Sequence, residues 1–506
     1  MNSQLPVLVV VIPLLIAPLI VLLRHPLAAW GLFTAAAASS FALSVACLIL
    51  VDQHGLLQAF LGGWEPPFGI EYRVDHANAL ILCLVSGIAL LVSPLALRSA
   101  ADEISEPRLY LFYSCLTLCL TGLLGMAATG DAFNVFVFLE ISSLSGYALI
   151  AMGRSRLALL ASFRYLILGT IGGTFFLTGV GLLYAVTGTL NMADLADRMV
   201  PAYGSRVLVA AAAFIVIGLA IKIALFPLHA WLPGAYAEAP SLVTAFMAAT
   251  STKVAAYILL RFAATVIGPV VVFSALPIGE LLGWLACIAM VAGSIAAIYQ
   301  TDFKRLLAWS SLAQIGYIVL GISLGTAAGA SAALTHMVNH GVIKCGLFIV
   351  AAVLIWRHGH AGISSFAGMP SRAPLLFAAF VIGALGLIGV PGTAGFISKW
   401  VLLEALIETA HWPAVVAVLV SSLLAVIYCW RIVEIAWFGT APTSTQKATA
   451  TATATAGDAH HSTRPLPAGA WISLGAASIL VIYLGLHSDW LVELTTAAGS
   501  SLLGAQ

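Results

Sequence analysis

Uncharged apolar stretches of about 20 residues recur along the whole length of this chain. A helix of that length spans the hydrocarbon core of a bilayer and satisfies its own backbone hydrogen bonds there. Charged residues make up 8% of the chain and hydrophobic residues 61%, whereas soluble globular domains contain about 25% charged residues. The sequence therefore predicts an all-α polytopic membrane protein.

About fourteen transmembrane helices are predicted when the apolar stretches are separated at polar breaks. The first stretch has no basic residue before it and no small-residue cleavage site, so a retained helix is expected rather than a removed signal peptide. The predicted spans are Leu5–Leu23, Leu27–Val51, Ala79–Leu97, Leu109–Ala128, Phe133–Met152, Leu157–Val186, Val207–Phe226, Leu242–Ile267, Leu281–Tyr299, Leu306–Leu324, Ala332–Ile355, Pro374–Val390, Val415–Phe438 and Trp471–Leu486.

Two of these regions are interrupted by proline next to an intramembrane lysine. Pro227 follows Lys222, and Pro391 precedes Lys399. Proline breaks a helix, and broken backbone at membrane depth needs protein or a water-filled cavity around it. We therefore expect two discontinuous helices. One such helix in each half of a chain is typical of an inverted repeat.

This pattern predicts five parts of the chain. N-terminal transmembrane helices 1–3 occupy residues 1–108, and two inverted five-helix repeats follow at residues 109–267 and 281–438. Residues 439–467 contain an Ala-Thr repeat and two adjacent histidines, which predicts a flexible cytoplasmic linker with solvated imidazoles rather than a metal site. The last transmembrane helix and a C-terminal tail occupy residues 468–506.

The basic residues of the loops predict the orientation of the chain. Twelve lie in one set of alternate loops and four in the opposite set, and the richer set faces the cytoplasm under the positive-inside rule. Both termini are then expected on the non-cytoplasmic side of a multi-pass protein of the cell inner (plasma) membrane. The richer set is Arg24, Arg98, Arg108, Arg154, Arg156, Lys304, Arg305, Arg357, Arg372, Arg431, Lys447 and Arg464.

Seven ionisable residues inside the predicted spans are the main candidates for function. A charged side chain at the centre of a membrane helix costs about 2.5–3.5 kcal/mol on insertion scales, so an unpaired set would cost roughly 15–20 kcal/mol. That exceeds the stability of a typical protein, and we expect these residues to face one another or water. They are Glu140, Lys222, Lys253, His336, His340, Lys344 and Lys399.

Two of the acid–base candidates have open alternatives. Glu140 is either a structural ion-pair partner between two helices or a titrating carboxylate coupled to a nearby lysine, and the other titratable groups favour the second role. His229, in the break after Lys222, either relays protons or holds the loop.

His336, His340 and Lys344 recur at every fourth position and share one face of a helix. Two histidines at this spacing can bind zinc, but they lack the acidic residue of a zinc-binding HExxH motif, and Lys344 disfavours a divalent cation. A proton relay is the better interpretation because imidazole both accepts and donates a proton near neutral pH. Neighbouring charges in such a series change each other's proton affinity by roughly 4 kcal/mol at about 4 Å.

Cofactor and nucleic-acid chemistry are not indicated by the sequence. The seven cysteines form no CxxC pair or metal-ligand spacing, which indicates core residues rather than an iron–sulfur cluster or a disulfide framework. Glycine-rich nucleotide motifs are absent from the sequence, and a net charge of +1 provides no basic face for nucleic acid. We expect no redox or hydrolytic site in this chain and no metal.

Five motifs between residues 109 and 438 carry a family resemblance. They are FNVFVFLEISSLSGYALIA (Phe133–Ala151), KIALFPLHAWLPGAYAEAPS (Lys222–Ser241), TDFKRLLAWSSLAQIGY (Thr301–Tyr317), HMVNHGVIKCGLF (His336–Phe348) and GVPGTAGFISKW (Gly389–Trp400). In combination they resemble the antiporter-like subunits shared by Mrp-type multisubunit Na⁺/H⁺ antiporters and respiratory NADH–quinone oxidoreductase (complex I). The FNVFVFLE motif, Gln314 and the lysine at position 399 are most similar to the D-type branch of the Mrp antiporter subunits.

The resemblance also implies roles for individual residues. It implies discontinuous seventh and twelfth helices, in agreement with the proline breaks. Gln314 departs from relatives that carry histidine at that position. The implied path consists of a coupling pair, Glu140 and Lys222, a central Lys253, and a proton route through His336 and His340 to Lys399.

The main hypothesis is a subunit of a multisubunit monovalent cation (Na⁺)/proton antiporter that translocates protons through the Glu/Lys/His series. Other membrane subunits of a hetero-oligomeric complex and the lipid bilayer are its expected partners. The alternative is a non-redox proton-pumping subunit of an NADH–quinone oxidoreductase or membrane-bound hydrogenase-type complex. A third hypothesis, a structural scaffold, predicts that neutralising Lys253 and Lys399 lowers stability without changing ion flux.

Overall fold

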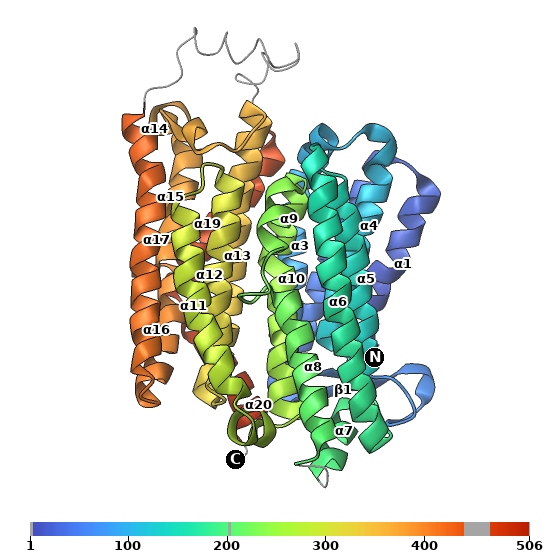
Figure 1. Ribbon diagram of the computed structural model, residues 1–506. Helices are drawn as coiled ribbons and strands as arrows, with labels where there is room; N and C mark the ends of the chain where they lie inside the picture. The colour runs from blue at the N-terminus through green and yellow to red at the C-terminus, as the bar shows by residue number, and fades with distance from the viewer. Residues whose placement is uncertain (1–3, 201–203, 440–465, 505–506) are drawn as a thin grey trace.

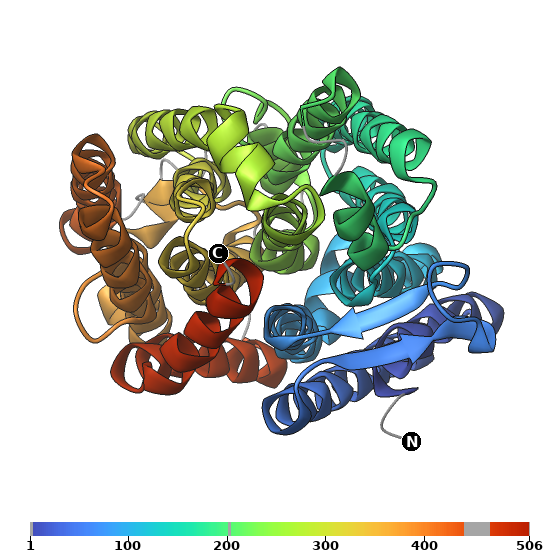
Figure 2. The ribbon, with the colours of Figure 1, turned by 90° about the horizontal axis from the view of Figure 1, so that it is seen from below.

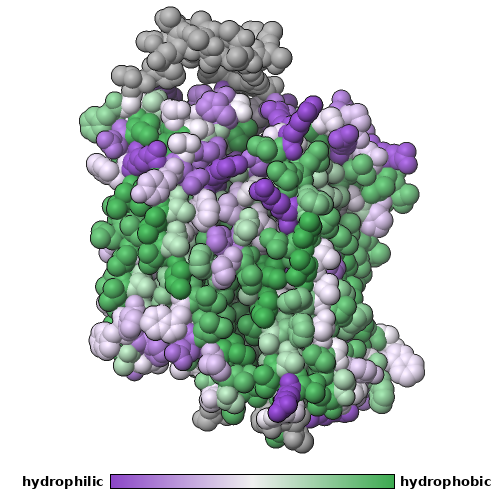
Figure 3. All heavy atoms as spheres, viewed as in Figure 1, coloured by the Kyte–Doolittle hydropathy of each residue, from purple (hydrophilic) through white to green (hydrophobic). Residues whose placement is uncertain are grey.

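The computed structural model describes residues 4–200, 204–439 and 466–504. Figure 1 shows a bundle of long helices that run between two ends of the molecule. In the described part, thirteen helices are long and apolar enough to cross a membrane, and an apolar belt separates two more polar ends in Figure 3. The chain is an all-α polytopic membrane protein, as the composition predicts.

The observed helices lie close to the predicted spans. The first ten are α1 (Leu5–Leu23), α2 (Pro26–His54), α3 (His76–Glu103), α4 (Leu109–Ala128), α5 (Ala132–Ala151), α6 (Arg156–Thr187), α7 (Met192–Met199), α8 (Arg206–Ile223), α9 (Leu232–Glu238) and α10 (Ser241–Arg261). The later ones are α11 (Ile278–Ile298), α12 (Phe303–Ser323), α13 (Ala327–His358), α14 (Met369–Arg372), α15 (Pro374–Ile388), α16 (Ala394–Glu408), α17 (Trp412–Phe438), α19 (Ala468–Leu486) and α20 (Asp489–Leu503).

Polar residues begin several of these helices, because the first N–H groups of a helix have no partner inside it. The Asp131 side chain accepts from the N–H of Asn134 at the start of α5. Ser155 does the same at α6, and Asp302 at α12. These caps set where each apolar span begins.

Both expected discontinuous helices are present. α8 ends at Ile223, where Ala224 adopts a left-handed backbone with φ 62°, and the chain resumes as the short helix α9. α15 ends before Gly389 and Gly392, whose φ values of 88° and 86° favour glycine, and α16 follows. At 15 residues, α15 is about 22 Å long and too short to span the hydrocarbon core of about 30 Å alone.

Three helices, α10, α12 and α13, form the centre of the bundle. Their membrane-spanning windows are 94%, 89% and 89% buried, whereas those of α1, α2 and α17 are 33% buried. Polar side chains on the central helices are therefore surrounded by protein rather than lipid. This is the part of the chain in which ionisable residues can be held by neighbouring helices.

A small sheet lies at one end of the bundle, between the second and third predicted spans. Strands β1 (Leu57–Phe60) and β2 (Glu71–Val74) pair antiparallel, with Leu57 opposite Val74 and Phe60 opposite Glu71. The Glu71 carboxylate is buried and accepts from the amide groups of Gln58 at 2.8 Å and Asn191 at 2.7 Å. The bond from Asn191 attaches the hairpin to the segment that precedes α7.

The two ends of the described chain lie at the same end of the bundle (Figures 1 and 2). The predicted tail contains a further helix, α20, which lies at the lower end of the bundle in Figure 1. It packs against α13 through a 2.8 Å hydrogen bond between the hydroxyls of Thr495 and Thr335. Most of the predicted linker, including His460 and His461, lies outside the described residues.

Each proposed repeat contains the expected helices. Residues 109–267 comprise α4, α5, α6, the broken pair α8 and α9, and α10, with the short α7 between α6 and α8. Residues 281–438 comprise most of α11, then α12, α13, the broken pair α15 and α16, and α17, with the short α14 before α15. The inverted relation between the two sets stays a prediction, as do the boundaries of the five parts.

Candidate functional site

Glu140 and Lys222 form an ion pair between α5 and α8. Lys222 Nζ lies 3.4 Å from Glu140 Oε1 and donates to the hydroxyl oxygen of Ser143 at 2.8 Å. The Lys222 side chain is 5% exposed and that of Glu140 is 22% exposed. The pairing that the resemblance implied is therefore present geometrically, with the serine as a third partner.

Helix α6 leaves room for this pair through two glycines one turn apart. A Cβ on Gly173 would lie 2.3 Å from Glu140 Oε1, and one on Gly169 would lie 2.0 Å from the Tyr147 hydroxyl oxygen. Only glycine lets the polar ends of two α5 side chains approach the backbone of α6 this closely. The surface of α6 thus shapes the space around the carboxylate.

Lys222 lies in the last turn of α8, next to the break. The final carbonyl groups of a helix have no partner in the helix and carry a partial negative charge, which favours a nearby cation. One of them, the carbonyl oxygen of Ile221, accepts from the indole Nε1 of Trp231 at 2.9 Å. Trp231 therefore connects the segment after the break to the last turn of α8, next to Lys222.

His336 is held at both ring nitrogens. Nε2 lies 3.0 Å from the amide oxygen of Gln314, and Nδ1 lies 2.8 Å from the Ser398 hydroxyl oxygen. With the amide oxygen facing the ring, Nε2 donates, and Nδ1 of a neutral ring accepts from Ser398. Gln314 is therefore a direct hydrogen-bond partner of the His336 ring.

His340 lies one turn after His336, and the two rings stack with centroids 5.7 Å apart. Both ring nitrogens of His340 are buried and have no hydrogen-bond partner among the residues that the structure describes. The side chain lies within electrostatic range of Lys253, Lys344 and Lys399. The charges of three lysines of the predicted series therefore act on this ring.

Lys253 and Lys344 are fully buried, and they are held mainly by backbone carbonyl groups. Lys253 Nζ donates to the carbonyl oxygen of Ala248 on its own helix, α10. Lys344 Nζ donates to the carbonyl oxygen of Leu307 at 2.8 Å and to the Ser310 hydroxyl oxygen on α12 at 2.5 Å. Within the described residues, neither amine has a carboxylate within salt-bridge distance.

Lys399 reaches back across the second helix break. It lies on α16, but its Nζ donates to the last carbonyl oxygens of α15, those of Leu387 at 3.1 Å and Ile388 at 2.8 Å. The Ser422 hydroxyl oxygen accepts at 3.0 Å, and the amine lies 4.8 Å from the centroid of the Tyr317 ring. The break therefore supplies the acceptors that stabilise a buried amine without a carboxylate.

The interactions in the structure link the seven candidates in two groups. The first is the Glu140–Lys222 pair, and the second comprises Lys253, His336, His340, Lys344 and Lys399. Aromatic side chains that the sequence analysis did not single out pack near the first helix break. Tyr165 stacks on Trp231 with centroids 4.0 Å apart, and the Tyr236 hydroxyl donates to the carbonyl oxygen of Met247 at 3.3 Å.

Two further buried cations were also not singled out as site residues. Lys304, at the start of α12, donates to the carbonyl oxygen of Ala239 at 2.6 Å. At the opposite end of α10, Arg261 pairs with Asp75 at 2.8 Å. Burial works against the charged form of Asp75, but Arg261 and two backbone N–H groups outweigh it and lower the pKa of that carboxyl.

Comparison with known proteins places these features in a family. Residues 129–425 match the model of the "NADH:quinone oxidoreductase/Mrp antiporter, TM" family. The chain belongs to this family. The matched residues of this antiporter-like chain include both helix breaks and all seven candidate residues.

Curated relatives of this antiporter-like chain come from both branches of the family. It is 41% identical over 504 residues to the N subunit of NADH-quinone oxidoreductase of Desulforudis audaxviator (strain MP104C), covering 97% of this chain and 98% of the relative. It is 29% identical over 501 residues to the D-type Na⁺/H⁺ antiporter protein of Bacillus subtilis (strain 168), covering 99% and 97%.

Solved structures show the same fold over nearly the whole chain. One chain of an archaeal membrane-bound sulfane sulfur reductase superposes with a TM-score of 0.86 at 30% identity, covering 99% of this chain and 98% of that one. A chain of the Mrp complex from Dietzia sp. DQ12-45-1b gives a TM-score of 0.85 at 25% identity, covering 99% and 97%. The protein is therefore an antiporter-like membrane subunit of the Mrp or complex I type.

Proposed function

We propose that this chain translocates protons across the cell membrane, in exchange for a monovalent cation such as Na⁺, as one subunit of a larger membrane complex. The observation that carries the proposal is the set of seven ionisable residues in the interior of the bundle. Six of these residues are buried inside the bundle and Glu140 is partly buried. Charged groups in that setting are expensive without a partner, and they are usually functional.

The geometry supports a stepwise transfer. Loss or gain of a proton at Glu140 or Lys222 changes the charge of a pair whose atoms are 3.4 Å apart, and charges at this separation interact strongly at the low effective dielectric of the interior. In the second group, His340 lies within electrostatic range of three lysines. A proton arriving at one amine disfavours protonation of its neighbours, so a proton moves onward rather than accumulating.

Water is expected to complete the path at His340. A buried polar group that makes no hydrogen bond costs about 1–3 kcal/mol, and both of its ring nitrogens lack a partner among the described residues. Bridging waters satisfy such groups in most proteins. We expect hydration of this region to link Lys253 to the His336 ring.

Ion flux in vesicles tests the proposal. The purified complex with Glu140→Gln is expected to lose proton flux, since the variant keeps the side-chain shape but removes the charge from the Lys222 pair. Glu404→Gln is the matched control, because Glu404 is an exposed carboxylate of α16 that accepts from Trp400 at 2.6 Å and contacts none of the seven residues. Retained flux in Glu140→Gln and in Lys222→Ala would contradict the proposal.

Cation dependence and orientation need their own measurements. Proton movement in vesicles that requires Na⁺ supports exchange, and equal movement with an impermeant cation contradicts it. The non-cytoplasmic placement of both termini is tested by labelling a cysteine introduced near each end with a membrane-impermeant thiol reagent. Labelling from the outside of whole cells is the expected result.

A second candidate function is favoured by a specific relative. The 41% identity to a protein named as the N subunit of NADH-quinone oxidoreductase supports proton pumping that is driven by redox partners. Copurifying subunits discriminate between the two candidates: flavin or iron–sulfur proteins favour the redox complex, and small membrane subunits alone favour the antiporter. A scaffold without transport would show unchanged flux when Lys253 and Lys399 are neutralised together.

A further inference from the structure

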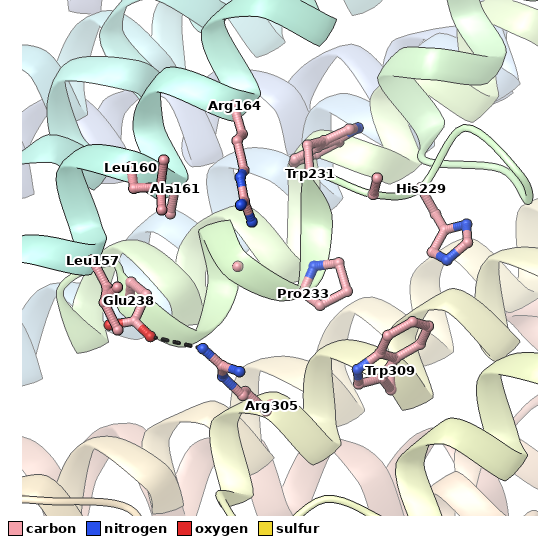
Figure 4. A pocket seen from close by; sticks show the side chains of 12 residues that line it. Leu157, Leu160, Ala161, Arg164, His229, Trp231, Pro233, Glu238, Arg305 and Trp309 are labelled. Atoms are coloured by element: carbon pink, nitrogen blue, oxygen red, sulfur yellow. Dashed lines mark hydrogen bonds and ion pairs between the residues drawn. The ribbon is translucent and has the colours of Figure 1, made fainter.

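A pocket of about 400 Å³ opens beside the first helix break, between α6, α9 and α12. Figure 4 shows Arg164 extending from α6 into this space, opposite Arg305 and Trp309 of α12. We call it the Arg164 pocket. Its lining includes Leu157, Leu160, Arg164, Pro233, Arg305 and Trp309.

Arg164 lies on the apolar outer surface of α6. The surrounding residues of that helix, Leu160, Phe163 and Ile167, are 43%, 56% and 45% exposed and form an apolar outer surface. Arg164 has no ion pair or hydrogen bond to any residue that the structure describes. A charged side chain on such a surface requires a counterion or the headgroup region of the membrane.

The length of α6 places Arg164 at the level of lipid headgroups. The helix has 32 residues and is therefore about 48 Å long, whereas the hydrocarbon core is about 30 Å thick. A centred helix extends about 9 Å beyond the core at each end, and Arg164 lies about 12 Å from the start of the helix. The guanidinium is thus close to the boundary between headgroups and hydrocarbon.

The charges of the pocket leave one positive charge uncompensated. Arg305 is paired with Glu238 at 3.1 Å, which leaves Arg164 for an external anion. Guanidinium groups bind phosphate oxygens through two parallel hydrogen bonds. Leucines on one wall suit acyl chains, and tryptophan is favoured at the membrane interface.

We propose that the Arg164 pocket binds the phosphate headgroup of an anionic membrane lipid, such as phosphatidylglycerol. Basic pockets between membrane helices on the side with more basic residues are suited to such headgroups. The lipid would contact the break between α8 and α9, because Pro233 and Trp231 both line the pocket. Trp231 in turn holds the carbonyl oxygen next to Lys222, so the lipid would lie against the segment that positions this lysine.

Native mass spectrometry of the purified complex tests the proposal. The complex is titrated with phosphatidylglycerol and, separately, with phosphatidylcholine, and the number of retained lipids is counted. Arg164→Gln is expected to weaken retention of phosphatidylglycerol by about tenfold, because a hydrogen bond to a charged group contributes at least that factor. Arg108→Gln is the matched control, since Arg108 is exposed at the same end of the bundle and does not line the pocket.

Each alternative occupant gives a different result. Equal retention of the two lipids by the unmodified complex would overturn the proposal, and this outcome does not depend on the variant folding. Arg164→Lys, which keeps the charge, should preserve the preference for phosphatidylglycerol. Displacement of the lipid by millimolar inorganic phosphate alone would indicate a site for free phosphate. Cross-linking from position 164 to a copurifying subunit would indicate that protein covers the pocket, and either result would overturn the lipid assignment.

Discussion

Replacing Gly173 by alanine places one methyl group against the Glu140 carboxylate without removing any charge. The added Cβ would lie 2.3 Å from Oε1, whereas an ordinary contact is 3.4 Å or more, so the oxygen must retreat by about 1 Å. Because Oε1 is the end of a side chain, it can move while the backbones of α5 and α6 stay in place. The same oxygen is the atom 3.4 Å from Lys222 Nζ.

The size of the effect follows from this displacement. Lengthening the pair from 3.4 Å to about 4.4 Å weakens the attraction by about 1 kcal/mol at an effective dielectric near 20. One kcal/mol corresponds to a factor of about five in an equilibrium constant or a rate. We therefore expect proton flux in Gly173→Ala to fall by up to about fivefold.

Gly181→Ala on the same helix is the matched control. A Cβ at Gly181 would meet no atom within 4 Å, and both variants gain the same helix propensity, about 1 kcal/mol at most. Flux is measured with a pH-sensitive dye in vesicles that contain equal amounts of each complex. Gly181→Ala is expected to match the unmodified protein.

A double-mutant cycle separates the ion pair from a general effect of packing. If Gly173 acts through the carboxylate, Gly173→Ala should cause no further loss of flux in a background that already carries Glu140→Gln. Equal flux in Gly173→Ala and Gly181→Ala would refute the argument. An additive loss in the double variant would also refute it, because the glycine would then act elsewhere.

Three further outcomes are expected. Gly395→Ala should lower the unfolding temperature strongly, because the added Cβ would lie 1.8 Å from the carbonyl oxygen of Gly386, a backbone atom that cannot move aside. A Cβ at Gly475 would meet no atom within 4 Å, so Gly475→Ala, the control, should be neutral. Asp75→Asn should cost about 3 kcal/mol at pH 7, where the Arg261 pair is intact. The folded-state pKa of Asp75 is lowered below 3.8. The stabilisation is therefore present above the ordinary pKa and is lost as the pH falls through the folded value, so the unfolding temperatures of variant and wild type should converge in acid, below the ordinary pKa of the carboxyl. Ser398→Ala leaves Nδ1 of the buried His336 without its 2.8 Å partner, which should cost about 1–3 kcal/mol in thermal unfolding and reduce flux; unchanged flux would argue against a relay through this ring.

The membrane fold could be predicted because hydrophobicity acts locally. Each apolar stretch must be a helix in lipid, whatever its neighbours are. The positions of the spans therefore follow from the hydrophobicity of each stretch along the chain. The breaks at Pro227 and Pro391 could be predicted for the same reason, since proline acts on its own backbone. Helix α20 and the β1–β2 hairpin were missed because both are too short and too polar to be recognised as membrane spans. Packing against α13 and the segment before α7 holds them in place.

The candidate site could be predicted only in part. An ionisable residue in an apolar stretch is visible in the sequence because of its cost, and this indicated all seven residues. Arg164 also lies in a predicted span, Leu157–Val186. It is not among the seven candidates, although the energetic cost of a charge in a membrane helix applies to it too. No local signal pointed to Gln314 and Ser398 as the partners of His336, or to Gly173 as the neighbour of Glu140.

The sequence by itself determined that this chain lies in a membrane, where its helices run and which charges they carry, because transfer to hydrocarbon depends on each segment alone. Only the tertiary structure decided which charges meet. It paired Glu140 with Lys222, brought His340 within electrostatic range of three lysines and gave Lys399 the carbonyl groups of a different helix. Contacts of this kind depend on how helices distant in the chain pack together.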